Sequence, residues 1–377
     1  GQFDDSRLAV DLLHALFANG GLALNYAEVM ALEKEDEQVS GAVFRDVEGK
    51  YLAGESEQKK FIVKAKSVIN AAGVWVDEIM KMDRPGHKKT IRPSQGVHLV
   101  LDKSFLPGDH ALMIPKTSDG RVLFAVPWHG HLVVGTTDTP IDSSSEEPVA
   151  LEEEIQFILE TATEYLEKPV EREDVLSVFA GLRPLAAPRD GSSKTKEISR
   201  NHKIIISDSK LITVIGGKWT TYRKMGQDMI DTAVGQGLLN RSESQTKSFR
   251  ILNSGTHEPE NGKPGTGFRG AGTYSQYGYH ASEIAALVNK EPALGVAIHR
   301  DLPYTWAEVD WICRNEMVVH LEDLLARRLR ALFLNAKASQ EIAGEIGERV
   351  APLLGWSADR TKFEIEAFRK VVGNYLL

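Results

Sequence analysis

The stretch 61-FIVKAKSVIN-70, followed without a break by 71-AAGVWVDEIMKM-82, decides the fold of the first part of the chain. The first segment has the β-branched and aromatic composition of a strand, and the second carries apolar residues at helical spacing behind a glycine. A strand that passes through a short glycine-containing turn into a helix is the unit from which α/β nucleotide-binding sheets are built. We therefore expect a sheet of that type here.

The segments before this junction extend the same domain. Between residues 4 and 21, apolar side chains recur at helical spacing behind an Asp-Asp-Ser start and before a Gly-Gly stop, which predicts an amphipathic helix. Segments 22–32 and 39–46 have strand composition. Much later, 211-LITVIGG-217 runs as a strand into a helix over 218–234, so we expect the chain to return to the α/β domain.

A different pattern of closely spaced strands begins after Pro85. Strands are predicted at 97–102, 121–128 and 131–138, ahead of a helix at 151–166, and further strands at 174–184 and 203–208 belong to the return to the α/β domain. The second and third of these strands are separated only by a short His-Gly turn, which is typical of a hairpin. The sequence therefore predicts a second, mostly antiparallel domain inserted into the first.

The last part of the chain is predicted to be helical and separate. Residues 241–272 are rich in Ser, Gly, Pro and Asn, which is typical of a linker. Within them, 265-GTGFRG-270 matches the G-x-G-x-x-G pattern of dinucleotide-binding turns, but it lacks the preceding strand that such a turn requires. Beyond the linker, Trp306, Val309, Cys313 and Met317 share a helical face. The expected fold class is α/β plus all-α. The predicted units are two parts of the α/β domain at 1–85 and 174–240, the inserted domain at 86–173, and a helical domain at 273–377 that follows the linker.

Composition excludes several classes of function. A net charge of −8 and a pI near 5.8 argue against general attraction to nucleic acid, so an anionic substrate needs a local cluster of cations. The single cysteine, Cys313, permits no intrachain disulfide. His129 and His131 have no carboxylate or cysteine partners with which to form a metal site, so we expect no metal. No apolar run approaches the length of a spanning helix and the start has no signal-peptide pattern, so we expect a reducing, cytoplasmic setting with at most peripheral membrane contact.

An ordered set of motifs runs along nearly the whole chain. These are 1-GQFDDSRL-8, 70-NAAGVW-75, 133-VVGTTD-138, 181-GLRPL-185, 215-IGGKWTTYRKMG-226 and, in the helical tail, 318-VVHLEDLLARRLRALFLNA-336. Together they resemble the FAD-dependent glycerol-3-phosphate dehydrogenase family, and the glycerophosphate oxidases are similar. The resemblance implies FAD-binding parts at 1–85 and 174–240, the latter also lining the substrate pocket, and a β-rich substrate domain at 86–173.

In that family a strand, a GxGxxG turn and a helix bind the ADP half of FAD ahead of the segment like GQFDDSRL. Here that segment begins at Gly1. The resemblance therefore implies an incomplete FAD-binding domain, truncated at its amino terminus. We expect the 377-residue chain alone to bind FAD weakly or not at all, to lack dehydrogenase activity, and to expose a sheet edge that favours a homodimer.

Candidate cofactor contacts lie at two glycine-containing turns. From the residues alone, Gly216-Gly217 is as readily a structural turn as a place where the backbone approaches a planar ring. The resemblance favours flavin contact, with Lys218 stabilising negative charge on the reduced flavin rather than being only solvated. The candidate residues are Ala72, Gly73, Trp75, Gly216, Gly217, Lys218, Thr220 and Thr221.

Candidate substrate contacts are Arg183, Arg200 and His98. Isolated arginines are usually surface or ion-pair residues and a lone strand histidine is usually packed, so the residues alone leave those alternatives open. Both arginines match family arginines of the substrate pocket, where planar cations suit a phosphate ester. His98 matches a pocket histidine, and an imidazole can accept the proton of the substrate's C2 hydroxyl.

The implied reaction is oxidation of sn-glycerol 3-phosphate to dihydroxyacetone phosphate, with FAD reduced and electrons passed to quinone at the inner face of the cytoplasmic membrane. Three alternatives stay open. Oxygen as acceptor would make the protein an oxidase; an amine or amino-acid oxidase of the same superfamily would bind a carboxylate instead of a phosphate. The third is a non-enzymatic chain whose helical tail is an interaction module.

Overall fold

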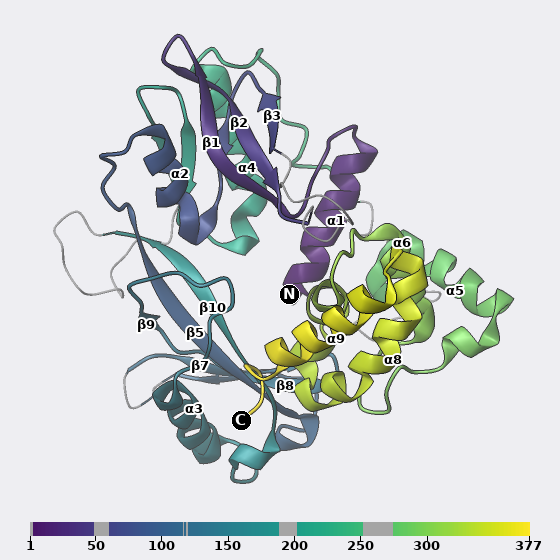
Figure 1. Ribbon diagram of the computed structural model, residues 1–377. Coiled ribbons are helices and arrows are strands. Elements are labelled where there is room, and N and C mark those ends of the chain that lie inside the picture. Colours follow the sequence, from purple (N-terminus) through teal and green to yellow (C-terminus); the bar gives the residue numbers. More distant parts are fainter. Residues whose placement is uncertain (1–2, 49–59, 116, 118–119, 188–201, 252–273) are drawn as a thin grey trace.

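The computed structural model describes residues 3–48, 60–115, 117, 120–187, 202–251 and 274–377 (Figure 1). It contains a mixed α/β part, a large antiparallel sheet and a helical part, which confirms the expected fold class. Arg200 and most of the predicted linker, including 265-GTGFRG-270, lie outside the described residues.

The α/β part is organised around two neighbouring parallel strands. Strands β4 (Ile69–Asn70) and β12 (Ile212–Ile215) pair in parallel, and β11 (Lys203–Ile206) lies antiparallel on the other side of β12. β4 leads through the 3-10 turn Gly73–Trp75 into α2 (Val76–Asp83). β12 leads through the 3-10 turn Trp219–Thr221 into α4 (Tyr222–Gly235). Two strand–turn–helix junctions from distant parts of the sequence therefore end at the same sheet edge.

A separate antiparallel sheet precedes these junctions. It consists of β1 (Ala27–Glu35), β2 (Gln38–Asp46) and β3 (Lys60–Lys64), in that order. Two predictions were wrong here: the strand expected at 22–32 begins only at Ala27, and the strand expected at 61–70 is two strands in different sheets. The chain leaves β2 after Lys64, where Ala65 N donates to Ser40 O, and composition does not reveal this change of partner.

The large sheet is antiparallel throughout. Its order is β10-β5-β8-β7-β6, with the short β9 (Thr139–Pro140) also paired to β5. The bounds are β5 Ile91–Asp102, β6 Leu112–Ile114, β7 Leu123–Trp128, β8 His131–Gly135 and β10 Val175–Ala186. The predicted His-Gly hairpin turn joins β7 to β8. Because β10 pairs with β5 along its length, we propose that the substrate domain continues past residue 173 to about Ala186.

Alternation along β5 gives this sheet two different faces. Val97, Leu99 and Leu101 point to one face and are buried with Ile155 and Ile158 of α3 (Glu152–Tyr165). The other face takes the even-numbered residues of β5 and looks toward the helical part (Figure 1). The apolar contacts with α3 thus fix the sheet and leave the opposite face available for polar side chains.

The helical part has a core of its own. It contains α5 (Ala281–Lys290), α6 (Trp306–Asn315), one π-helical turn (Asp323–Arg328), α7 (Ala331–Leu334), α8 (Ala336–Leu354) and α9 (Ala358–Val372). Leu324, Leu332 and Ile346 are fully buried within it. One detail of the prediction was wrong: Met317 lies beyond the end of α6, with a φ of 52°. None of the helices in the described ranges is long and apolar enough to cross a membrane.

Helix α1 (Asp5–Ala18) lies between the α/β part and the helical part (Figure 1). Its buried Arg7 donates to both carboxylate oxygens of Glu316, at 3.1 and 2.7 Å. Asp4 caps the helix by accepting from Arg7 N at 2.9 Å, and its other carboxylate oxygen lies 3.1 Å from His129 Nε2. Arg7 therefore anchors α1 to the helical part through a buried ion pair, which is costly to break on one side only.

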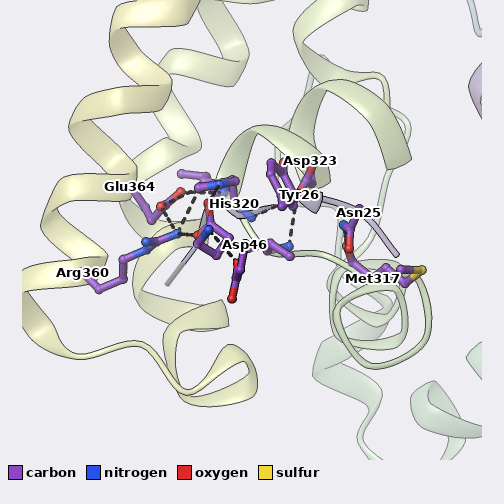
Figure 2. Close-up of polar contacts among 11 residues, drawn as sticks. Asn25, Tyr26, Asp46, Met317, His320, Asp323, Arg360 and Glu364 are labelled. Atoms are coloured by element: carbon purple, nitrogen blue, oxygen red, sulfur yellow. Dashed lines mark hydrogen bonds and ion pairs between the residues drawn. The ribbon is translucent and has the colours of Figure 1, made fainter. Parts of the chain in front are cut away.

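A second polar contact joins the loop after β2 to the helical part (Figure 2). His320 Nε2 lies 3.0 Å from Glu48 Oε1, and its Nδ1 lies 2.9 Å from Glu364 Oε1. Arg360 contacts both carboxylates, at 3.2 Å to Glu48 and 2.7 Å to Glu364. Nearby, Tyr26 Oη donates to Asp323 Oδ1 at 2.8 Å. Charged side chains from both sides thus connect the two parts.

Candidate functional site

Two predicted substrate residues lie on the same face of the large sheet, the one opposite α3. On β5 this face carries Ser94, Gly96 and His98, and on β10 Arg183 pairs with Ser94 in the strand register. The guanidinium of Arg183 lies across Gly96, because a Cβ there would stand only 2.2 Å from Arg183 Nη2. A glycine at position 96 is therefore required for the arginine to lie over the sheet.

Arg183 is held in place by the loop that follows β8. Its Nη1 donates to the carbonyl oxygens of Gln95 at 3.2 Å and Thr137 at 3.1 Å, and its Nη2 donates to Thr136 Oγ1 at 3.0 Å. Asp138 Oδ1 lies 3.6 Å from Nη1 and also accepts a hydrogen bond from Ser94. These contacts fix the orientation of a cation that is about one third exposed, with 34% of its side chain accessible.

His98 lies beside Arg183 in an environment that keeps it neutral. Its ring stacks on Phe179 of β10, with centroids 5.1 Å apart, and it covers Gly135, where a Cβ would stand 2.4 Å from His98 Cδ2. Burial lowers the pKa of His98 to about 4, and the positive charge of Arg183 contributes in the same direction. At neutral pH the imidazole is therefore uncharged and can accept a proton.

Open space lies between these two side chains. Gly181 pairs with Gly96 across β10 and β5, it is exposed, and a Cβ there would meet no atom within 4 Å. The helical part borders this surface, since Phe333 of α7 packs edge-on against Phe179 at a centroid distance of 4.9 Å. A small molecule resting over Gly181 could therefore reach both His98 and Arg183.

The two strand–turn–helix junctions carry the predicted cofactor contacts. Gly73, Gly216 and Gly217 have positive φ angles of 59°, 69° and 87°, and a Cβ on Gly73 would meet no atom within 4 Å. Neither α2 nor α4 has a side chain capping its first turn. Backbone N–H groups at such helix starts suit an electron-rich or anionic partner. The residues at these turns therefore fit the approach of a planar cofactor.

The side chains around the second junction point to solvent or pack beneath it. Lys218, Thr220 and Thr221 are exposed, and Thr221 Oγ1 donates to Lys218 O at 2.9 Å. Gly217 is confined from the other side, where a Cβ would stand 2.6 Å from Met225 Sδ. The glycine is thus required by the fold, and the lysine is available to a ligand at this edge.

The two groups of residues meet through a small apolar contact. Ile91 at the start of β5 and Ala186 at the end of β10 are buried together with Val76 of α2 and Ile215 of β12. The first turn, with Ala72 and its neighbours, therefore adjoins the ends of the strands that carry His98 and Arg183. The structure brings together all the predicted site residues that it describes, in two neighbouring groups.

The residues that support Arg183 were not predicted from the sequence. Thr136, Thr137 and Asp138 belong to 133-VVGTTD-138, which served as a marker of resemblance, and Glu154 fell within the helix expected at 151–166 without being given a role. His129 and His131 serve the hairpin turn, where His131 Nδ1 lies 3.0 Å from His129 O. Within the ranges that the structure describes, no group of three or more His, Cys, Asp or Glu side chains is arranged to hold a metal ion.

Comparisons with known proteins agree with this geometry. The family model for FAD dependent oxidoreductases matches residues 1–223, and that for the C-terminal domain of alpha-glycerophosphate oxidase matches residues 271–361. The chain is 37% identical over 384 residues to the mitochondrial glycerol-3-phosphate dehydrogenase of Mus musculus, covering 97% of this chain and 51% of that protein. It is 35% identical over 397 residues to the mitochondrial glycerol-3-phosphate dehydrogenase of Arabidopsis thaliana, covering 100% and 62%.

A solved structure extends the likeness to three dimensions. The glycerol-3-phosphate dehydrogenase of Bacillus halodurans, complexed with FAD, superimposes with a TM-score of 0.75 at 25% identity, covering 99% of this chain and 74% of that one. The chain spans about half the length of the mouse relative. The resemblance expected from the motifs is confirmed: the chain belongs to the FAD-dependent oxidoreductases, whose cofactor is FAD, and among them to the glycerol-3-phosphate dehydrogenase family.

Proposed function

We propose that the protein takes part in the FAD-dependent oxidation of sn-glycerol 3-phosphate to dihydroxyacetone phosphate. The observation that carries this proposal is the shared sheet face on which the Arg183 cation and the neutral His98 imidazole flank the open glycine surface at Gly181. A three-carbon alcohol phosphate needs a cation for its phosphate and a proton acceptor for the hydroxyl that is oxidised.

Arg183 is proposed to bind the phosphate. A planar guanidinium held by Gln95, Thr136 and Thr137 presents its donors in a fixed geometry, so less conformational entropy is lost on binding. Asp138, at 3.6 Å, offsets part of the positive charge when the site is free. The fixed cation still provides the local positive charge that a chain of net charge −8 needs for an anionic substrate.

His98 is proposed to accept the proton of the C2 hydroxyl. A neutral imidazole can take this proton as the C2–H and O–H bonds break and the C=O bond forms. A base with a pKa near 4 is weak, but a phosphate dianion beside it would raise that pKa, because an opposite charge favours the protonated form. Substrate binding thereby strengthens the base at the moment when it is needed.

The residues at the two strand–turn–helix junctions would hold FAD, which would supply the acceptor for the hydride from C2. The turns at Ala72, Gly73 and Trp75 and at Gly216 and Gly217 are proposed to hold it, because their backbone conformation leaves N–H groups at two helix starts. Lys218, Thr220 and Thr221 are exposed at the same edge. Lys218 is proposed to stabilise negative charge there, since a cation placed where charge develops lowers the barrier.

The electron acceptor and cellular location are further parts of this proposal. We propose a quinone acceptor and peripheral contact with the inner face of the cytoplasmic membrane because the family resemblance implies them; the names of the mitochondrial relatives state neither. Oxygen as acceptor is the alternative, and it would make the protein an oxidase. These two are separated by measuring hydrogen peroxide formation against quinone reduction in the FAD-loaded protein.

The substrate is tested by binding. We expect the 377-residue chain, titrated calorimetrically with FAD present, to bind sn-glycerol 3-phosphate and to bind glycerol much more weakly. Wherever the protein is prepared with FAD bound, anaerobic addition of the phosphate ester should bleach the flavin absorbance, whereas the 377-residue chain alone is expected to hold too little FAD for this change. Preference for an amino-acid carboxylate would favour an amino-acid oxidase, and binding of neither ligand would favour an interaction module.

A further inference from the structure

Helix α3 carries one glutamate whose surroundings differ from those of its neighbours. Glu152 and Glu153 are exposed at the start of the helix, whereas Glu154 is only 3% exposed. Its Oε1 accepts from Thr137 Oγ1 at 2.7 Å and from Thr139 Oγ1 at 2.6 Å. Its Oε2 accepts from Gln95 Nε2 at 2.8 Å and from Leu151 N at 3.1 Å. Four donors thus satisfy a buried carboxylate.

The side-chain donors all belong to the segments that hold Arg183. Thr137 and Gln95 are the residues whose carbonyl oxygens accept from Arg183 Nη1. Thr137 Oγ1 also accepts from Val97 N at 3.0 Å, which joins the loop after β8 to β5. Glu154 therefore fixes both carbonyl-bearing segments from the side of the sheet opposite to Arg183.

A capping role explains only part of this arrangement. Accepting from Leu151 N closes the first turn of α3, and a glutamate three residues into a helix commonly does this. That single bond requires no burial and none of the contacts to Thr137, Thr139 and Gln95. A buried carboxylate is costly unless all its contacts are made, so its removal would release three side chains at once.

We propose that Glu154 is the positioning residue that sets the orientation of Arg183 and so the affinity for the substrate phosphate. This inference rests on the proposed function, since it assigns Arg183 to the phosphate. Its action is indirect: the carboxylate orders Thr137 and Gln95, and their carbonyl oxygens aim the guanidinium. Displacements of about 1 Å at such a contact reduce affinity or rate by factors on the order of tenfold to a hundredfold.

The test compares Glu154→Gln with Glu153→Gln, the adjacent exposed glutamate on the same helix. Dissociation constants of the 377-residue chain for sn-glycerol 3-phosphate and for inorganic phosphate are measured calorimetrically with FAD present. We expect Glu154→Gln to raise both constants about tenfold and Glu153→Gln to leave them unchanged. Amide hydrogen exchange in residues 136–139 should become faster in Glu154→Gln alone, because one of the two acceptor oxygens is replaced by an NH2 group that can only donate.

A double variant separates positioning from general destabilisation. If Glu154 acts through Arg183, then Glu154→Gln should weaken phosphate binding little further in an Arg183→Ala background, since the affected contact is already gone. Equal losses in both backgrounds would overturn the proposal, as would wild-type affinity in Glu154→Gln. Glu154→Asp keeps the charge and serves as the conservative variant, with affinity expected between those of wild type and Glu154→Gln.

The same data distinguish this inference from the proposed function. If the wild-type chain binds phosphate, and Arg183→Ala weakens this binding while Glu154→Gln leaves it at the wild-type value, only the role of Glu154 is wrong. If Arg183→Ala leaves phosphate binding unchanged, the assignment of the phosphate to Arg183 is wrong, and the proposal for Glu154 is overturned with it.

Discussion

His98 and His320 are both half-buried histidines with an arginine nearby, yet their pKa values are shifted in opposite directions. Burial lowers the pKa of His98 to about 4, and the Arg183 charge adds to this effect. Burial would lower the pKa of His320 too, but the hydrogen bonds and charges of Glu364 and Glu48 outweigh it and raise that pKa. The decisive difference is the charge beside each ring: two carboxylates contact His320, whereas the charge that acts on His98 is the cation of Arg183.

This difference separates two uses of the same side chain. On the sheet face, a neutral imidazole stacked on Phe179 is prepared to accept a proton. At the contact between the α/β and helical parts, an imidazole whose pKa is raised lies between the carboxylates of Glu48 and Glu364 (Figure 2). The first arrangement suits chemistry and the second suits stability, so changes at the two sites should affect different measurements.

The largest effect is expected from His98→Gln in FAD-loaded protein. A general base contributes about 10²–10⁴-fold to the rate of its step, so the rate of flavin reduction by sn-glycerol 3-phosphate should fall by at least about a hundredfold. The dissociation constant of the substrate should change far less, because the base acts in the transition state. Stopped-flow measurements of flavin reduction at several substrate concentrations give both the rate and the dissociation constant. A reduction rate in His98→Gln equal to that of wild type would show that His98 is not the base.

Arg183→Ala should act mainly on binding. Losing a charge-assisted contact costs about 1.5–3 kcal/mol, so kcat/KM should fall by at least about tenfold, with KM raised. The pKa of His98 should rise toward its ordinary value as the positive charge is removed. The control is Arg172→Ala, an exposed arginine paired with Glu152, which should leave steady-state kinetics unchanged. Unchanged kinetics in Arg183→Ala would contradict its role at the phosphate.

The smallest effect is expected at His320 and appears in stability. Because its folded-state pKa is raised, its contribution is complete below about pH 6.5 and is lost as pH rises through the folded-state pKa. Denaturant unfolding of wild type and His320→Gln at several pH values should therefore differ by on the order of 1 kcal/mol at low pH and converge at high pH. The control is His110→Gln, at an exposed histidine, which should leave the free energy of unfolding unchanged at every pH. A difference between wild type and His320→Gln that grows as the pH rises would contradict this account.

Sequence patterns predicted most of the fold because periodicity and turns are local. The helix at 151–166 and the His-Gly hairpin were confirmed within a few residues. The split of 61–70 into β3 and β4 was missed, since it depends on which strands pair. The order of the predicted elements along the chain puts the substrate domain between two parts of the α/β domain. Strands β4 and β12, which precede and follow that domain in the sequence, pair in parallel in one sheet.

The site was predicted less completely than the fold. His98 and Arg183 were found through motifs, and the structure places them on one face, although their roles stay predictions. Glu154 could not be found, because three successive glutamates at a helix start are ordinary and only the register of β5 brings Gln95 to one of them. His320 was missed for the same reason, since Glu48 and Glu364 come from distant segments.

The central claim is that the sheet face holds a neutral histidine beside a cation that binds the substrate phosphate. NMR titration of the His98 imidazole, assigned by its loss in His98→Gln, tests this most directly. The account predicts a pKa of about 4 in the free protein and a higher value when sn-glycerol 3-phosphate is bound, because the dianion favours the protonated ring. An ordinary pKa near 6.5, unchanged by the ligand, would contradict it.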